Sequence, residues 1–571
     1  MIAKTKDSDF IVSQISDEES QLPSSDSSQI FSEDTPSYGS IPRGAESSVP
    51  GEGMSKASFY ITLLCAFSNV FLASMDSTMV ATLLEVIASD LEAMDNVSWV
   101  ATSYLLSCAA FQPLFGKISD VFGRKAVVLV CCLLFGIGCL ISGLADSLWW
   151  LVAGRFIAGI GGGGFFSLTT IIVSDLVPNR QRGLYQGYVN VFFHTGAASG
   201  GVLAGIIEKF FGWRTAFLFQ VPVCIITAGL TAAYLNLPKG SMGLGVQDSS
   251  AWKKMKSLDY IGSAILVLSL FAMMLAASFG GKEISFDSIQ FKFLVTFSIM
   301  GLTAFYFYER LVAEQPVIPV KMLHNRTVLA SSFNCWFACM NMFITFYYIP
   351  FYWSSVKNVT ALDCGLRMIL GSLVASLSSV YAGWYIKKTS KYWNLLVGSG
   401  VATVLGSIAI YFSTKKDSAL EDYFITLPVR YAGSVDITVI LVAMISAVSH
   451  SEQALVTSIQ YGFRSTGSTL GVSIANAILE FGLHRQIDAK FNLLSGIPDE
   501  FKDPKVLSFI KQSALKNPHY AFDGAPSFFK DSIISSYDEA CHYVFIFLIV
   551  TGVATFITTL FVEENNLKKD E

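Results

Sequence analysis

Four ionisable side chains stand inside long apolar stretches of this chain, where an ionised group is costly. They are Asp76, Arg155, His194 and Asp436. A carboxylate at bilayer depth costs a few kcal/mol, so an acid in this position normally faces a cavity or a charged partner. The Asp76 carboxyl can take up a proton or attract a cation, and competition between the two would couple their movements.

Asp76 and Arg155 each have a structural interpretation as well, and both interpretations stay open. The Asp76 carboxylate can form a structural ion pair, or a polar cap with the neighbouring hydroxyls of Ser74, Ser77 and Thr78. Arg155 keeps its charge at any physiological pH, so a buried guanidinium here needs an acid or backbone carbonyls. It therefore serves either coupling to proton movement or plain structural pairing.

Asp436 and His194 also each have a functional and a structural interpretation. Arg430 precedes Asp436 by six residues, a spacing that does not put the two side chains on one helix face. Asp436 is therefore free to meet a substrate, unless it is structural. His194 titrates near neutral pH when exposed, but a histidine in mid-span is more often a satisfied packing residue. Glu85 and Glu452 lie nearer to helix ends and suit an interfacial position.

Apolar stretches of about 20 residues recur along the chain, and each is long enough to cross the hydrocarbon core of a bilayer. Their boundaries fall near 59–84, 99–115, 126–145, 148–173, 187–207, 215–235, 260–279, 293–311, 328–353, 365–386, 392–412, 424–448, 454–481 and 543–562. About fourteen crossings follow, so both termini lie on one side. The pattern predicts an all-α polytopic membrane protein.

Composition agrees with this class and excludes others. Of 571 residues, 52% are hydrophobic and 15% charged, and the net charge of -5 leaves no basic surface for nucleic acid. The polar segments show no metal-ligand spacing, catalytic triad or phosphate loop, so neither an enzyme nor a cofactor is expected. The glycines at 159–164 fit a dinucleotide pattern formally, but inside an apolar span they favour close helix packing. Cys364 and Cys541 lie on one side of the membrane, where they either pair or stay free.

We expect five segments along the chain. A disordered cytosolic tail covers 1–56, a six-helix bundle 57–236, a cytosolic linker with two inserted helices 237–312, a second six-helix bundle 313–562, and a cytosolic tail 563–571. The second bundle carries a luminal loop at about 483–540, in which Val506, Phe509, Ile510 and Ala514 predict a short amphipathic helix lying on the membrane surface. In the first tail, Tyr38 to Ile41 has the spacing of a sorting signal for an adaptor, or is solvated linker.

The sidedness follows from basic residues, because short loops rich in Lys and Arg are retained in the cytosol. Such residues gather in alternate loops, at Lys117, Arg124, Lys125, Arg180, Arg182, Lys239, Lys253, Lys254, Lys256, Lys321, Arg326, Lys387, Lys388 and Lys391. Of three glycosylation sequons, Asn325 is then cytosolic and Asn96 is close to the bilayer. Asn358 is the best placed for modification.

The stretch 116–125, which we name the latch loop, organises the first bundle. It reads Gly-Lys-Ile-Ser-Asp-Val-Phe-Gly-Arg-Lys, and its glycines predict a tight turn at both ends. Charges at helix ends can pair in one conformation and separate in another, so Asp120, Arg124 and Lys125 are not expected to touch substrate. The stretch 383–391, which is the loop after the tenth span, echoes the latch loop after the second span. It keeps the first glycine and the basic run but not the aspartate or the second glycine.

The latch loop resembles the signature loop of the major facilitator superfamily. Three further stretches are similar to motifs of its fourteen-span drug:proton antiporter branch: 75–80 in the first helix, 151–159 around Arg155, and 212–222 at the start of the sixth helix. The stretches 185–190, 453–458 and 463–468 resemble the fungal vacuolar basic amino acid transporters within that branch. One stretch departs, since 196–201 reads Gly-Ala-Ala-Ser-Gly-Gly where antiporters usually carry a Gly-Pro pair.

This resemblance implies the major facilitator fold, with about 14 transmembrane helices in two six-helix bundles plus two inserted helices. It also implies exchange of protons for small cationic amino acids (lysine, arginine, histidine) across the vacuolar membrane, around a central site with Asp76 and Asp436. Gly116, Asp120, Gly123, Arg124 and Lys125 would latch the two halves in one conformation. The alternatives are export of drugs or other organic cations at the plasma membrane, and a nutrient receptor that does not transport.

Overall fold

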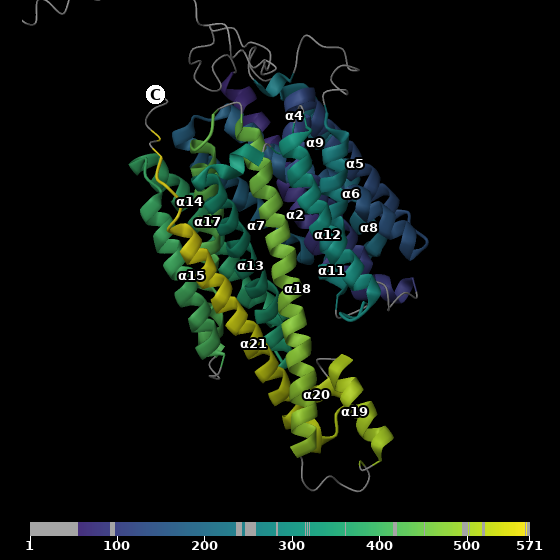
Figure 1. Cartoon of the computed structure of the whole chain (residues 1–571). Coiled ribbons are helices and arrows are strands. Elements are labelled where there is room, and N and C mark those ends of the chain that lie inside the picture. Colours follow the sequence, from purple (N-terminus) through teal and green to yellow (C-terminus); the bar gives the residue numbers. More distant parts are fainter. Residues whose placement is uncertain are drawn as a thin grey trace, which may run out of the picture. The chain divides into compact units, whose positions relative to one another are not determined.

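The computed structural model of the chain describes residues 55–91, 98–235, 242–245, 258–280, 284–313, 316, 318, 320–359, 361–414, 419–449, 452–493, 501, 503–516, 520–565 and 567. The predicted tail at 1–54, with Tyr38 and Ile41, lies outside these residues, as do the Asn96 sequon and most of the predicted linker. The described residues contain helices and a single isolated bridge, and no strand (Figure 1).

The first half of the chain packs into one helical bundle. Its elements are α2 (Lys56–Asp90), α3 (Ser98–Phe111), η2 (Gln112–Leu114), α4 (Phe115–Phe122), α5 (Arg124–Gly143), α6 (Leu148–Leu176), α7 (Asn179–Phe211), α8 (Trp213–Leu218) and α9 (Gln220–Tyr234). One apolar core joins them, in which α2 packs on α7, and α6 packs on α3 and α5. The second crossing is broken at η2 because Pro113 has no N–H to continue the helix.

The second bundle repeats this plan. It consists of α13 (Arg326–Ser355), α14 (Ala361–Thr389), α15 (Trp393–Ser413), α16 (Ala419–Phe424), α17 (Leu427–Ser446), α18 (Gln453–Leu493) and α21 (Ser527–Thr559). Two apolar cores hold it together, and α13 packs on both α18 and α21. The Asn325 side chain caps α13 by accepting hydrogen bonds from the N–H groups of Thr327 and Val328.

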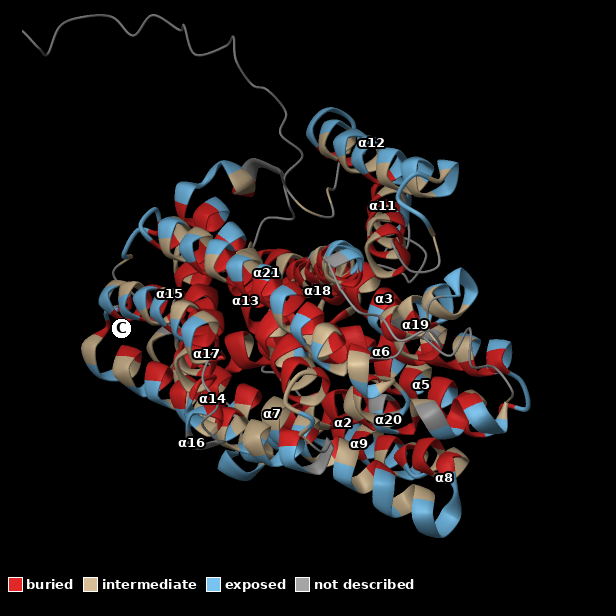
Figure 2. Cartoon of the chain, turned by 90° about the horizontal axis from the view of Figure 1, so that it is seen from below, coloured by how far each residue is buried: buried red, intermediate tan, exposed pale blue. Residues whose placement is uncertain are grey.

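Two inserted helices, α11 (Tyr260–Phe279) and α12 (Ile289–Leu311), lie between the bundles in sequence. Helix α11 packs against α3 and α18, and α12 packs against α11. Only Ser298, Phe305 and Glu309 of α12 are buried, and Figure 2 shows this helix largely exposed at the edge of the bundles. A mostly apolar helix with this exposure suits contact with lipid.

Twelve of the described helical segments are long and apolar enough to cross a membrane. The remaining two predicted crossings correspond to α3 with α4, which proline interrupts, and to α18, which carries more polar residues. Both pack among the other helices. The prediction of an all-α polytopic membrane protein is therefore confirmed, while the count of fourteen crossings and the side that faces the cytosol remain predictions.

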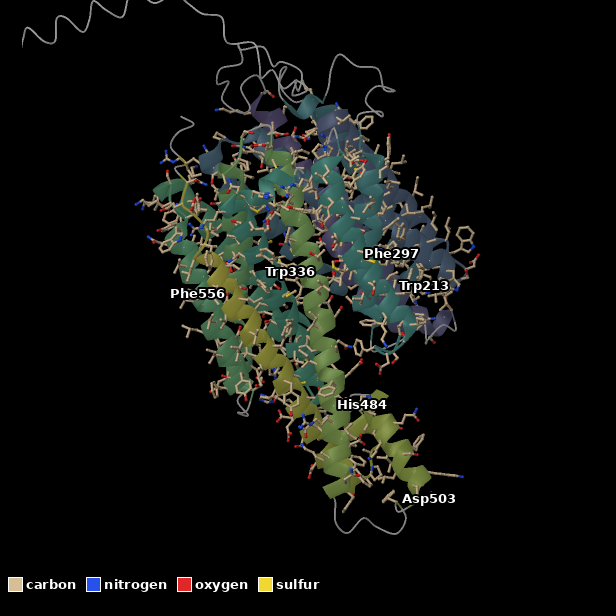
Figure 3. All side chains as sticks on the ribbon, viewed as in Figure 1. Trp213, Phe297, Trp336, His484, Asp503 and Phe556 are labelled. Atoms are coloured by element: carbon tan, nitrogen blue, oxygen red, sulfur yellow. The ribbon has the colours of Figure 1, made fainter. Side chains whose placement is uncertain are left out.

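The segment predicted as a luminal loop at about 483–540 is largely helical in its described part, and its luminal position remains a prediction. Helix α18 has 41 residues, about 60 Å at 1.5 Å per residue, so it extends well beyond a hydrocarbon core of about 30 Å. Its end forms a helical extension with α19 (Pro504–Lys516), α20 (Tyr520–Asp523) and the start of α21. Figure 3 places His484 and Asp503 in this extension.

The predicted amphipathic helix exists as α19, but its apolar face covers protein. Ile510 and Ala514 are buried against α18 and α21, whereas Phe509 is 65% exposed. The Tyr537 hydroxyl donates to the Ala514 carbonyl at 2.7 Å, and Lys511 pairs with Asp488 at 2.8 Å. The apolar side chains on this face are therefore used to hold the extension together.

Replacement of Ile510 tests this assignment. Ile510→Ala should destabilise the extension by about 2–5 kcal/mol, because it removes buried methyl groups and leaves a cavity. Limited proteolysis of the segment between α18 and α21 should accelerate. Phe509→Ala, one position away on the exposed face, should leave the proteolysis rate unchanged, and equal rates for the two variants would contradict the packing.

Candidate functional site

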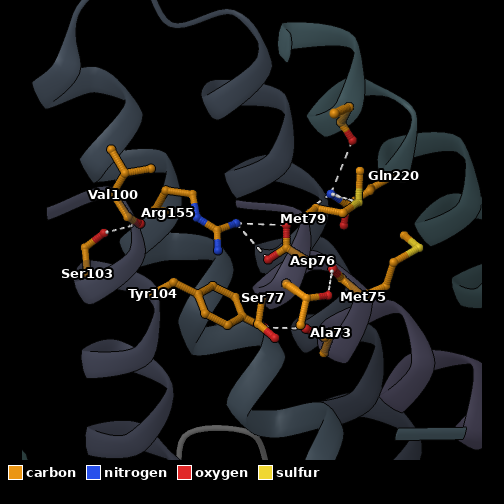
Figure 4. Close-up of polar contacts among 12 residues, drawn as sticks. Ala73, Met75, Asp76, Ser77, Met79, Val100, Ser103, Tyr104, Arg155 and Gln220 are labelled. Atoms are coloured by element: carbon orange, nitrogen blue, oxygen red, sulfur yellow. Dashed lines mark hydrogen bonds and ion pairs between the residues drawn. The ribbon is translucent and has the colours of Figure 1, made fainter. Parts of the chain in front are cut away.

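A buried ion pair joins α2 to α6 inside the first bundle (Figure 4). The Arg155 Nη1 atom donates to both carboxylate oxygens of Asp76, at 2.9 and 2.7 Å, and Gln220 Nε2 donates to Asp76 Oδ1 at 3.0 Å. The Asp76 and Arg155 side chains are 0% and 1% exposed. Arg155 Nε and Gln220 Oε1 have no hydrogen-bond partner. The cluster is dry, charged and incompletely satisfied.

Aromatic rings hold the Arg155 guanidinium in place. Its Cζ atom lies 4.3 Å from the centre of the Tyr104 ring and 5.7 Å from that of Phe217, within the range of a cation–π contact. The Tyr104 hydroxyl donates to the Ala73 carbonyl at 3.2 Å. A Cβ atom at Gly162 would collide with that hydroxyl, so the glycine-rich stretch of α6 provides the space for Tyr104. This packing explains the glycines at 159–164, which fit a dinucleotide-binding pattern only formally.

The structure brings Asp76 and Arg155 together, and it excludes a polar cap on Asp76 in this conformation. The hydroxyl of Ser77 donates to the Ser74 carbonyl at 2.8 Å, and that of Thr78 donates to the Met75 carbonyl at 3.0 Å. Because Arg155 occupies both carboxylate oxygens, Asp76 does not offer a free charge to a cationic solute here. Its role with protons remains a prediction.

Asp436 lies apart from this pair, within the second bundle. Its carboxylate accepts a short hydrogen bond from the Ser399 hydroxyl of α15, and its Oδ2 atom has no partner. The side chain is fully buried between α17 and α15. Arg430 is not its ion-pair partner, as the spacing indicated. The structure therefore does not bring Asp436 and Asp76 to one site.

His194 lies on α7 at mid-helix and is half-buried. Its ring packs edge-on against Phe193. Arg430 and Arg464, both from the second bundle, are close enough to act on the ring electrostatically. His194 thus belongs to the interface between the bundles and not to the Asp76 cluster.

The latch loop carries its own charge cluster. Arg124 is buried; its Nη1 atom pairs with Asp120 Oδ1 at 2.6 Å and its Nε atom with Asp175 Oδ2 at 2.9 Å. Its Nη1 atom also donates to the Ser119 hydroxyl at 2.6 Å. Burial raises the pKa of the Asp120 carboxyl, and the Arg124 guanidinium opposes that shift. Lys125 follows in the first turn of α5, half-buried.

The prediction of a turn at Gly116 is wrong, whereas the turn at Gly123 is confirmed. Gly123 has φ +90°, a conformation that favours glycine, and it separates α4 from α5. Gly116 is helical and lies against α18 of the other bundle. A Cβ atom there would collide with the Ser458 hydroxyl and lie 2.8 Å from the Ala454 carbonyl oxygen. The latch loop therefore contacts the second bundle through its first glycine.

The stretch 383–391, which corresponds to the latch loop in the second bundle, makes a similar close contact with the first bundle. Gly383 in α14 lies against Gly183 of α7 so closely that a Cβ atom would collide with its backbone. Ser390 follows Gly383 by seven residues, the spacing from Gly116 to Gly123, and it also has positive φ, +54°. The repeat thus keeps a close approach and a sharp turn, even where the second glycine is replaced.

Five side-chain hydrogen bonds join the described parts of the two bundles, and all involve the halves of the helices nearer to α4. They join Thr170 to Tyr461, Arg180 to Lys387, Asn190 to Ser379, Asn190 to Thr438 and Gln112 to Ser465. The bundles are closed against each other on this half. Over the part that the structure describes, no such bond joins them on the other half.

Two further predictions concern residues at the end of the bundles away from α4. Asn358 is exposed, in a turn with φ +52°, while Thr360 of its sequon lies outside the described residues, so glycosylation remains a prediction. Cys364 and Cys541 both have free thiols, so the disulfide alternative is not realised in this structure.

Sequence reasoning missed several partners. Gln220 and Tyr104 complete the Asp76 cluster, and Asp175 completes that of Arg124; contacts over such separations have no local signal. Arg430 and Arg464 could have been found, since an intramembrane arginine carries the same cost as an intramembrane acid.

Comparisons with known proteins agree with this architecture. The family model of the Major Facilitator Superfamily matches residues 66–475. The vacuolar membrane amino acid uptake transporter fnx2 of Schizosaccharomyces pombe is 33% identical over 505 residues, which cover 87% of this chain and 83% of that protein. The multidrug resistance protein fnx1 of the same yeast is 31% identical, covering 86% and 90%. Vacuolar basic amino acid transporter 1 of Saccharomyces cerevisiae is 27% identical, covering 79% and 84%.

Solved structures support the fold alone. The human organic anion transporter MFSD10 superposes with a TM-score of 0.55 at 15% identity, covering 88% of this chain and 99% of that one. The proton:xylose symporter XylE gives a TM-score of 0.55 at 13% identity, covering 90% and 99%.

The ion pair predicts a strong coupling between its two members. Asp76→Asn leaves a buried guanidinium without a carboxylate and should lower the stability of the protein by about 3–5 kcal/mol. The double variant Asp76→Asn, Arg155→Gln removes both charges and should recover much of that loss. Thermal unfolding in detergent measures both, and additive losses would contradict a direct pair.

The contact at Gly116 predicts a conformational effect. Gly116→Ala should destabilise the closed half by about 1–3 kcal/mol, because the added methyl group collides with α18. A cysteine placed at Ser465 in the closed interface should then react faster with a maleimide. Gly229→Ala in α9 is the matched control, since nothing lies within 4 Å of a Cβ atom there. Equal labelling in both backgrounds would contradict the latch.

Proposed function

Because the chain belongs to the Major Facilitator Superfamily, we propose that this transporter is an antiporter that moves basic amino acids into the vacuole in exchange for protons. The observation that carries this proposal is its likeness to fnx2 along most of both chains. Two relatives from Saccharomyces cerevisiae are named vacuolar basic amino acid transporters. The membrane would be that of the vacuole, with both termini in the cytosol.

The transport mechanism would be alternating access. The bundles would rock about a central site, and the closed half seen here would be the cytosolic one, because α4 and the basic loops lie at that end. The site would then open toward the vacuolar lumen. Gly116 on α18 and Gly383 on α7 would form the contacts that separate when the protein turns to the cytosol.

The Asp76–Arg155 pair would carry the proton. Arginine does not lose its charge, so protonation of Asp76 is the only way to neutralise a member of this pair. In the acidic lumen, a protonated Asp76 would release Arg155 and favour return to the cytosol-facing state. There a cationic amino acid would favour the charged carboxylate, and the proton would leave. The unpaired atoms Arg155 Nε and Gln220 Oε1 are ready to take new partners in that exchange.

A second function has its own support. The relative fnx1 is named a multidrug resistance protein and is similar over a comparable share of the chain. Export of organic cations by proton exchange at the plasma membrane would use the same pair. A nutrient receptor that does not transport is a third alternative, which accumulation of solute in vesicles would exclude.

Uptake by isolated vacuolar vesicles tests the proposal. Vesicles with an imposed proton gradient should accumulate radiolabelled lysine, and Asp76→Glu should retain part of this uptake, since a carboxylate remains. Asp76→Asn, matched for its amount in the membrane, should abolish accumulation. Undiminished gradient-driven uptake by the Asn variant would remove Asp76 from the mechanism, and absence of uptake by the unaltered protein would overturn the substrate.

A further inference from the structure

Arg430 is a buried cation without an anion. Its side chain, on α17, is 4% exposed. The guanidinium lies 4.8 Å from the centre of the Phe346 ring, its Nη2 atom is 4.0 Å from the Met368 sulfur, and its Nε atom has no partner. Among the residues that the structure describes, no carboxylate forms an ion pair with it. The contacts that it has are weak for a full positive charge.

Arg464 on α18 is a second cation without an ion pair at the same interface, and it is half-buried. Its Cζ atom lies 5.3 Å from the centre of the Phe193 ring of α7 and 5.6 Å from that of Tyr461. The Tyr461 hydroxyl bonds to Thr170 of α6, so this face of α18 meets the first bundle. The described carboxylates offer no ion pair to Arg464 either.

The two arginines converge on one stretch of α7. Ser434 and Thr438 follow Arg430 at intervals of four residues, so the three share a face of α17. Thr438 accepts a hydrogen bond from Asn190 of α7, and His194 lies one turn beyond Asn190. Arg464 lies over the ring of Phe193, which packs against His194. The cations therefore lie at the inner edge of the closed half, where hydrogen bonding between the bundles ends.

Three other arginines of this protein have acids. The buried Arg155 pairs with Asp76 and the buried Arg124 with Asp175, and the half-buried Arg367 pairs with Asp422. A buried charge without a counter-ion is costly, and the chain meets that cost elsewhere by pairing. Arg430 and Arg464 have no such pairing among the described residues.

We propose that Arg430 and Arg464 form a carboxylate-binding subsite between the two bundles, which takes the α-carboxylate of an amino acid. The proposal rests on the proposed function and adds to it the group by which the substrate is recognised. A guanidinium binds a carboxylate with two parallel hydrogen bonds and discriminates against solutes that lack one. The subsite explains how the protein selects an amino acid over an organic cation of the same length.

Three solutes of similar length separate the groups that are recognised. Lysine has the carboxylate and both ammonium groups, cadaverine is lysine without its carboxylate, and 6-aminohexanoate keeps the carboxylate and the distant ammonium group. The full-length protein in detergent should be stabilised against heat by lysine and by 6-aminohexanoate, but not by cadaverine. Potassium chloride at matched concentration should not reproduce the effect.

Variants at the two arginines complete the test. Arg430→Gln and Arg464→Gln should each weaken lysine binding roughly 30-fold or more, because one member of a buried charge pair is lost. Arg430→Lys should be affected less. The unliganded Gln variants should unfold at or above the temperature of the unaltered protein, since a charge without a counter-ion is removed; a structural role would lower it. Arg485→Gln, on an exposed position of α18, is the matched control.

The outcomes separate this proposal from the proposed function. Equal binding of cadaverine and lysine, unaffected by the Gln variants, would overturn the carboxylate subsite while leaving cation transport in place. Chloride protection equal to that of lysine would overturn it too, by assigning the arginines to an inorganic anion. Binding of 6-aminohexanoate or leucine that needs both arginines, without preference for lysine, would uphold the subsite and overturn the choice of basic amino acids.

Discussion

The buried ion pair between Asp76 and Arg155 is the interaction on which the rest of the first bundle depends. Arg155 cannot release its charge, and its side chain is 1% exposed, so Asp76 is the counter-ion on which it depends in this conformation. Gln220, Tyr104 and Phe217 surround the pair and keep it dry. A proton that reaches Asp76 therefore changes more than one carboxyl group, because it removes the counter-charge of the arginine. That dependence makes the pair suitable for coupling a proton to a movement of helices.

The contacts between the bundles complement this chemistry. Gly116 and Gly383, in corresponding positions of the two halves, each let a helix approach the opposite bundle without side chains between. Backbone contacts of this kind are either formed or broken, and they suit a protein that alternates between two states. Both halves thus share the close approach, the sharp turn and the basic run, whereas the aspartate of the latch loop, Asp120, belongs to one half only.

The sequence was sufficient for the fold but not for the pairings. Apolar runs of spanning length predicted the helices, and the cost of charge in a membrane singled out Asp76 and Arg155. Their contact joins residues 79 positions apart, which no periodicity predicts.

Gly116 was assigned to a turn because the motif looks like one, whereas its task is close packing in three dimensions. The helical extension was missed because its polar composition resembles a loop, although Ile510 and Phe529 supply a small core. Arg430 was considered only as a neighbour of Asp436, and Arg464 was not singled out, although an intramembrane arginine is as costly as an intramembrane acid.

The central claim is that Asp76 releases its proton when a basic amino acid binds, and proton release can be measured directly. Lysine added to the purified protein in weakly buffered solution, at a series of starting pH values, should acidify the medium. The account predicts acidification by the unaltered protein and none by a variant with asparagine at position 76. Equal acidification by both proteins would contradict the account, because the proton would then come from another group.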